Sequence, residues 1–220
     1  MSYETNVFIN CPFDKKYLSL LRPLLFTIIY LGLTPKIAAE RSDSGELRLF
    51  KICELIKSSK YSIHDLSRMK PEKLKELSRQ NMPFELGLDI GCRYFSEIYH
   101  DKKCLVLEKE KFRYMKGLSD ISGCDIKSHN EEPYKLVQEV RNWFVESILP
   151  QGVPSASSIW YKFNDFMSDF YDKRKSDGFT QDDLEIMPIP EYIQFMKIWC
   201  EENKASVKKV RKPAASAQGS

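Results

Sequence analysis

The chain has 220 residues, of which 42% are hydrophobic and 30% are charged, and these proportions exclude a disordered or fibrous protein. The 34 Lys and Arg residues and the 31 Asp and Glu residues leave a formal net charge of +3, too small to indicate nucleic acid binding by bulk electrostatics. The most apolar run, 23–33, is shorter than the roughly 20 residues of a membrane span, and no signal segment opens the chain, so we expect a cytoplasmic protein without a membrane partner.

The first part of the chain alternates short apolar runs with helical periodicity. Residues 6–10 predict a strand, and the apolar spacing over 15–33 predicts a helix. Residues 35–39 predict a second strand, 47–56 a second helix and 61–66 a third strand. The alternation favours crossover connections between parallel strands.

The same alternation continues after a polar stretch. An Asn before a Pro marks a helix start at Asn81, and the apolar run within 103–108 predicts a buried strand. Residues 124–126 form a weak last strand before an amphipathic helix over 133–148. We therefore predict an α/β fold with a flavodoxin-like parallel five-stranded sheet in the order 2-1-3-4-5, helices on both faces and a C-terminal helical extension.

The C-terminal part differs from this domain in composition. A Gly-, Pro- and Ser-rich linker over 151–158 precedes a helix, and residues 180–204 predict one or two short helices broken at Pro188 and Pro190. We divide the chain into an α/β domain (1–150), a helical extension (151–204) and a disordered basic tail (205–220). One side of the first helix carries an aromatic row, for which packing within the chain and a dimer surface are both open. The row comprises Trp160, Phe163, Phe166 and Phe170.

Cysteine and glycine patterns exclude several classes of site. The six cysteines form no C-x-x-C pair and have no neighbouring histidine pairs, so we expect reduced thiols, no disulfide and no metal. The chain has neither the G-x-G-x-x-G nor the G-x-x-x-x-G-K-[ST] motif, which leaves a standard dinucleotide fold or phosphate loop unsupported. We expect no cofactor.

Polar residues just after the predicted strands form the candidate binding site, because ligands of such sheets bind outside the carboxyl ends of the strands. A carboxylate at a strand end can bind a ribose hydroxyl or cap a turn, and an arginine can grip a phosphate or form a surface ion pair. A phenylalanine there can stack on a base or join the core. The candidate substrate-binding residues are Cys11, Pro12, Phe13, Asp14, Arg41, Asp65, Ser67, Arg68 and Asn81.

Glu85 is the candidate catalytic residue. We expect it in the first turn of its helix, where the helix dipole favours an ionised carboxylate. A fixed carboxylate can stabilise the cationic sugar of N-glycosidic bond cleavage or attack its carbon, whereas the alternative is ordinary helix chemistry. His64 is open to two interpretations, a general acid or a hydrogen-bonded core residue.

Two segments resemble a known family. Residues 61–68 (YSIHDLSR) and 81–88 (NMPFELGL) resemble the D-[LI]-[ST]…N-x-x-[YF]-E-L-G pattern of nucleoside 2-deoxyribosyltransferase-like proteins and related bacterial TIR-like domains. Residues 6–14 resemble the first strand and substrate loop of that group, and 119–126 with 140–143 resemble an uncharacterised bacterial branch. The resemblance spans about residues 6–147 and implies a flavodoxin-like sheet, a nucleoside or nucleotide in the cleft and Glu85 as the catalytic carboxylate.

Three functions follow as expectations. The first is an enzyme that cleaves or transfers the N-glycosidic bond of a nucleotide, with NAD-type substrates and a role in bacterial antiphage defence implied by the resemblance. The second is a non-catalytic nucleotide-binding sensor of the same fold, and the third is a nucleic-acid-associated module that uses the basic residues of 68–79, which are otherwise a solvated face. We expect a homo-oligomer with a small-molecule partner, and no nucleic acid.

Overall fold

The computed structural model describes residues 3–40, 43–69, 80–148 and 152–210. The chain forms two compact units, Met1–Asp165 and Phe166–Ser220, which meet within one helix. The domain boundary that we placed after residue 150 stays a prediction.

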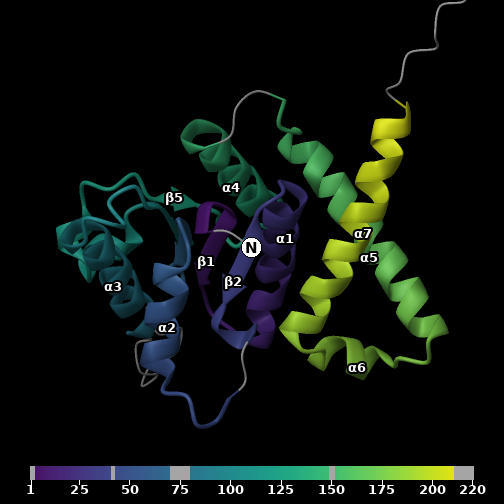
Figure 1. Ribbon diagram of the computed structural model, residues 1–220, viewed down its shortest axis with the longest axis horizontal. Coiled ribbons are helices and arrows are strands. Elements are labelled where there is room, and N and C mark those ends of the chain that lie inside the picture. The colour runs from purple at the N-terminus through teal and green to yellow at the C-terminus, as the bar shows by residue number, and fades with distance from the viewer. Residues whose placement is uncertain (1–2, 41–42, 70–79, 149–151, 211–220) are drawn as a thin grey trace, which may run out of the picture. The chain divides into compact units, whose positions relative to one another are not determined.

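The first unit is built on a parallel sheet whose strands run in the order β2-β1-β3-β4-β5 (Figure 1). Every neighbouring pair is parallel. This confirms the predicted α/β class, the strand order and the flavodoxin-like arrangement. The strands are β1 (Asn6–Asn10), β2 (Thr34–Ile37), β3 (Tyr61–Asp65), β4 (Lys103–Glu108) and β5 (Lys127–Ser128).

Helices cover both faces of the sheet. On one face α1 (Leu18–Tyr30) packs against α4 (Pro133–Ser147), and on the other α2 (Arg48–Lys57) packs against α3 (Asn81–Phe95) (Figure 1). All residues of β1 and β3 are buried, because strands in the middle of a doubly covered sheet have no solvent face. Short 3-10 turns complete this unit: η1 (Tyr3–Thr5), η2 (Lys15–Tyr17), η3 (Ala38–Glu40), η4 (Arg113–Lys116) and η5 (Ser119–Ile121).

Two predicted elements of the first unit start three residues later than predicted. The last strand is Lys127–Ser128 and not 124–126, because the N–H groups of Cys124 and Ile126 donate to turn carbonyls of Ile121 and Cys124. The first helix is shorter than 15–33, since a 3-10 turn precedes it and Gly32 leaves the helical region with a φ of +86°.

The C-terminal helices are α5 (Ala156–Ser176), α6 (Gln181–Ile186) and α7 (Ile189–Val210). Pro190 does not break a helix, because it is the second residue of α7, where no intrahelical N–H donor is needed. We expected a disordered basic tail from residue 205, but residues 205–210 belong to α7. Residues 211–220 lie outside the described part of the chain.

The aromatic row of α5 is used in packing within each unit. In the first unit the ring of Phe163 lies 5.6 Å from that of Phe26 on α1. In the second unit Phe166 contacts Trp199, and Phe170 contacts Tyr192, both on α7. Across the described ranges, no helix is both long and apolar enough to span a membrane.

Candidate functional site

The carboxyl ends of the strands bring most of the candidate residues to one edge of the sheet. β1 ends at Asn10, β3 at Asp65, β4 at Glu108 and β5 at Ser128. The segments that follow these strands carry Cys11, Ser67, Lys109 and His129. Two separate groups of buried polar side chains form here, one around Asp65 and one around Glu85.

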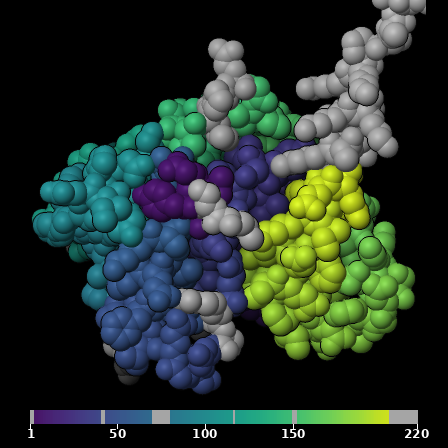
Figure 2. All heavy atoms as spheres, in the orientation of Figure 1, coloured from purple at the N-terminus to yellow at the C-terminus, as the bar shows by residue number. Residues whose placement is uncertain are grey.

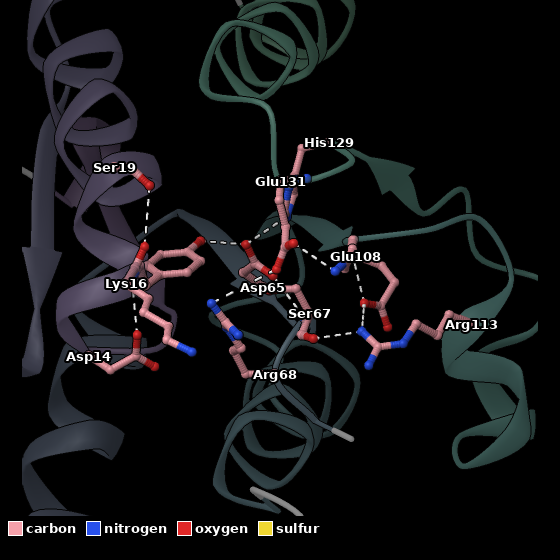
Figure 3. Close-up of polar contacts among 12 residues, drawn as sticks. Asp14, Lys16, Ser19, Asp65, Ser67, Arg68, Glu108, Arg113, His129 and Glu131 are labelled. Carbon is pink, nitrogen blue, oxygen red and sulfur yellow. Dashed lines mark hydrogen bonds and ion pairs between the residues drawn. The ribbon is translucent and has the colours of Figure 1, made fainter. Parts of the chain in front are cut away.

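Asp65 is fully buried and accepts three hydrogen bonds. Its Oδ2 accepts from the Tyr17 hydroxyl and from Nε2 of His129, which is 3.1 Å away (Figure 3). Its Oδ1 accepts from the N–H of Ser67 at 2.8 Å. Burial alone would raise the pKa of Asp65, but the hydrogen bonds from His129, Tyr17 and Ser67 lower it below its ordinary value. The carboxylate therefore connects the segments that follow β1, β3 and β5.

His129 has a defined tautomer because each ring nitrogen has one partner. The N–H of Glu131 donates to Nδ1 at 3.0 Å, so the ring proton is on Nε2, which donates to Asp65. The backbone of this turn is left-handed at two non-glycine residues, with φ of 53° at Asn130 and 59° at Glu131. Such conformations cluster at functional sites, and here the turn holds Glu131 near Lys109 and Arg68.

Glu108, the last residue of β4, is a second buried carboxylate in this group. Its Oε1 accepts from the N–H of Lys109 at 2.8 Å and lies 3.4 Å from Nη1 of Arg113 (Figure 3). Burial nevertheless raises the pKa of Glu108. Arg113 also donates to the carbonyl of Ser67, at 2.7 Å, and so connects the ends of β3 and β4.

Glu85 lies on α3 and faces the start of α2. Because α3 begins at Asn81, Glu85 is its fifth residue, so the expected place in the first turn and the dipole argument built on it are wrong. Its side chain is 7% exposed, and Oε1 lies 3.1 Å from Nη2 of Arg48. Burial raises the pKa of Glu85, and the Arg48 guanidinium and His64 offset only part of this effect. In the described part of the chain, no hydrogen bond is made to the second oxygen, Oε2.

A series of buried polar contacts links the ends of β1 and β3 to α3, the helix that carries Glu85. Nδ2 of Asn10 donates to Nδ1 of His64 at 3.0 Å and to the carbonyl of Met82 at 2.9 Å. Nε2 of His64 lies 3.0 Å from Oδ2 of Asp89, whose Oδ1 lies 3.2 Å from the ammonium of Lys102. This makes His64 a hydrogen-bonded core residue, and its hydrogen bond together with the Lys102 ammonium lowers the pKa of Asp89 to about 2 against the effect of burial.

Cys11 lies between the two groups. Burial raises the pKa of its thiol, and the negative charges of Asp65, Glu85 and Asp14 raise it further. Asp14 caps the turn η2 by accepting from the N–H of Tyr17 at 3.0 Å.

The other candidate residues differ in accessibility. Phe13 is 39% exposed and Pro12 is buried, whereas Asn81 is exposed at the start of α3. Arg68 lies beside the Asp65 group, with Nη2 at 3.9 Å from Oε1 of Glu131 (Figure 3). Arg41 lies outside the described residues.

Metal-binding atoms gather at one place among the described residues. The ligand atoms of His64, Asp89 and Cys104 all lie within 4.8 Å of one another. The Lys102 ammonium on Asp89 opposes a second cation there, so this donor set fits a buried hydrogen-bond network better than a metal centre. A cavity of about 470 Å³ lies along β4 between α3 and α4, and neither Glu85 nor Asp65 lines it.

The structure adds residues that sequence reasoning missed. Glu108 follows the same strand-end rule and was overlooked, and His129 was missed because β5 was placed three residues early. Arg48 and Tyr17 carry no sequence signal, since only the fold brings them to Glu85 and Asp65.

The fold and the strand-end residues define a flavodoxin-like α/β protein with buried carboxylates at the carboxyl edge of its sheet. No family model, curated protein or solved structure matches the chain.

Proposed function

We propose that this protein cleaves or transfers the N-glycosidic bond of a nucleotide, with Glu85 as the catalytic carboxylate. The observation that carries the proposal is the state of Glu85: it is buried, its pKa is raised, and one of its oxygens has no hydrogen-bond donor among the described residues. A carboxylate in such surroundings interacts strongly with positive charge that develops beside it.

The chemistry needs this carboxylate, the nucleotide and a nucleophile such as water. As the bond between the anomeric carbon and the base nitrogen breaks, the base leaves with the electron pair and the sugar becomes cationic. Glu85 stabilises this cation or forms an ester with it. Water or the hydroxyl of a second nucleophile then bonds to the anomeric carbon, which breaks the ester bond where one has formed and restores the carboxylate, and the proton of the nucleophile passes to the departed base or to solvent. The exposed Phe13 supplies an aromatic face for a base at the same edge.

The alternative is a nucleotide sensor without turnover. The ion pair between Arg48 and Glu85 favours it, because a neutralised carboxylate binds a ligand without attacking it. A role in antiphage defence and a homo-oligomeric state stay predictions.

The deciding experiment incubates the purified protein with NAD, NADP and a panel of nucleosides and nucleotides, and measures the free base by chromatography. Release of a base that is lost in Glu85→Gln supports the enzyme. Saturable binding without release supports the sensor, and turnover that is unchanged in Glu85→Gln would refute a catalytic Glu85.

A further inference from the structure

Arg48 joins the protein surface to the buried carboxylate of Glu85. It is the first residue of α2, and its side chain is 53% exposed although Nη2 lies 3.1 Å from Oε1 of a carboxylate that is 7% exposed. The segment of α2 lies at the surface of the first unit, as the blue spheres of Figure 2 show. Solvent and ligands therefore reach the guanidinium before they reach Glu85.

Most donors of this guanidinium have no acceptor among the residues that the structure describes. Arginine has five N–H donors, and the single contact of Arg48 within the described ranges is the one with Glu85. Of the two arginines that we considered for phosphate binding from the sequence, Arg68 is 14% exposed at the side chain and lies in the Asp65 group, and Arg41 lies outside the described residues. Arg48 is thus more accessible than Arg68, and it is the one that contacts the candidate catalytic carboxylate.

The start of α2 adds positive potential at the same point. Leu47 occupies the N-cap position, and its side chain makes no capping hydrogen bond. Partial positive charge at such a helix end favours anions, which reinforces the guanidinium without being required for the argument.

The ion pair has a consequence for catalysis. While Arg48 neutralises Glu85, the carboxylate has less negative charge to offer a cationic sugar. A phosphate group, which accepts two parallel hydrogen bonds from a guanidinium, competes with Glu85 for Arg48. Binding of a phosphate would therefore hold the substrate beside Glu85 and release its charge in one exchange.

We propose that Arg48 is the phosphate receptor of the site, and that it exchanges its ion pair with Glu85 for the phosphate of a nucleotide. This inference rests on the proposed function and narrows it, because it makes phosphorylated nucleotides, and not nucleosides, the substrate class. Arg48 is then the residue that couples phosphate recognition to the reactivity of Glu85.

The test compares ligands that differ by one phosphate. Nicotinamide mononucleotide with nicotinamide riboside, and AMP with adenosine, are measured for binding by calorimetry and for release of free base. The proteins are wild type, Arg48→Gln, Arg48→Lys and the control Arg93→Gln, which changes an exposed arginine in the last turn of α3.

We expect Arg48→Gln to weaken binding of the phosphorylated member of each pair by about 10- to 100-fold and to reduce the preference over the nucleoside. Arg48→Lys keeps the charge without the paired donors, so its affinity for the phosphorylated ligands should lie between those of wild type and Arg48→Gln. Arg93→Gln should bind them as wild type does.

The outcomes separate this inference from the proposed function. If a base is released and Glu85→Gln abolishes the release, but Arg48→Gln keeps the wild-type preference for phosphate, the inference is wrong and the function stands. If the preference depends on Arg48 but no base is released, the phosphate receptor stands and the enzyme assignment fails. If none of the four ligands binds to the wild-type protein, the phosphate receptor is refuted, and the proposed function is decided by base release from the wider panel that includes NAD and NADP.

Discussion

Glu85 and Asp65 are buried carboxylates at the same sheet edge, but their surroundings shift their pKa values in opposite directions. Asp65 accepts hydrogen bonds from Tyr17, His129 and Ser67, and its pKa is lowered. Glu85 has one guanidinium, and burial raises its pKa. A carboxylate whose oxygens are all occupied stabilises the fold, whereas one that is poorly compensated is available for chemistry.

Glu85→Gln should fold as well as the wild type and lose the proposed activity. The raised pKa means that ionised Glu85 is disfavoured in the folded protein, so at neutral pH a neutral isostere should leave the free energy of unfolding unchanged or higher. The amide cannot stabilise a sugar cation, and a loss of about 4 kcal/mol of transition-state stabilisation corresponds to roughly a thousandfold lower rate. Urea unfolding and base release measure the two effects, and a variant that is strongly destabilised would contradict this account.

Asp65→Ala should be strongly destabilising. It leaves a buried tyrosine hydroxyl and a buried histidine N–H without their acceptor, which we expect to reduce the free energy of unfolding by about 3–5 kcal/mol. The control is Asp120→Ala, since Asp120 is exposed. Urea titrations of both variants make the comparison, and equal midpoints would show that the Asp65 network contributes nothing to stability.

At the scale of elements, one buried ammonium joins two helices and a strand. Lys102, which directly precedes β4, donates to the carbonyls of Ile56 in the last turn of α2 and of Ser59 just after it, the former at 2.7 Å. The same ammonium pairs with Asp89 on α3 at 3.2 Å. Its charge is compensated from both sides, as a buried charge requires.

Lys102→Met should therefore destabilise the packing of α2 on α3. It removes the only ammonium beside Asp89 in the described part of the chain, leaves that carboxylate with its hydrogen bond to His64, and leaves two carbonyls without a donor, so we expect a loss of about 3–5 kcal/mol in the free energy of unfolding. The neighbouring Lys103→Met is the control, because Lys103 is exposed. The double variant Lys102→Met, Asp89→Asn should lose less than the sum of the two single losses, and additive losses would refute the pairing.

At the scale of the whole molecule, the buried carboxylates predict a particular pH dependence of stability. Burial raises the pKa of Glu85 and of Glu108 above the ordinary 4.5, so their ionisation destabilises the folded state above that pH. The pKa of Asp65 and of Asp89 is lowered from 3.8, so their ionisation stabilises the folded state and is lost in acid.

The expected result is a pair of opposite trends in variants compared with wild type. Glu108→Gln should be at least as stable as wild type at neutral pH, and the difference should vanish as the pH falls to 4.5. Asp89→Asn should be less stable at neutral pH, and the deficit should shrink as the pH falls from 3.8 towards about 2. Urea unfolding at a series of pH values measures both, and differences that do not change with pH would contradict the assigned shifts.

Much of the fold was predictable because hydrophobic periodicity is a local property. The bounds of β1 and β4 and the start of α3 are as predicted, since each is set by a short apolar run or by an Asn–Pro signal. β5 was placed wrongly because two residues give no periodicity, and its position depends on pairing with β4.

The site was predictable only in part. The strand-end rule selects Cys11, Asp14 and Asp65, which the fold brings to one edge. It does not reveal that Asp65 is fully occupied by partners from distant segments, nor that Arg48 and not a strand-end residue contacts Glu85.

By itself, the sequence determined the alternation of strands and helices, the parallel sheet and the edge at which polar residues gather, because these follow from side-chain pattern and from the handedness of crossovers. Only the tertiary structure decided that Asp65 has hydrogen-bond donors on both oxygens, whereas Glu85 has the Arg48 guanidinium on one oxygen among the described residues. The physical reason is that a carboxylate's pKa and reactivity depend on burial and on donors a few ångströms away, and the partners of Glu85 and Asp65 lie 37 and 64 residues away in the chain, at Arg48 and His129.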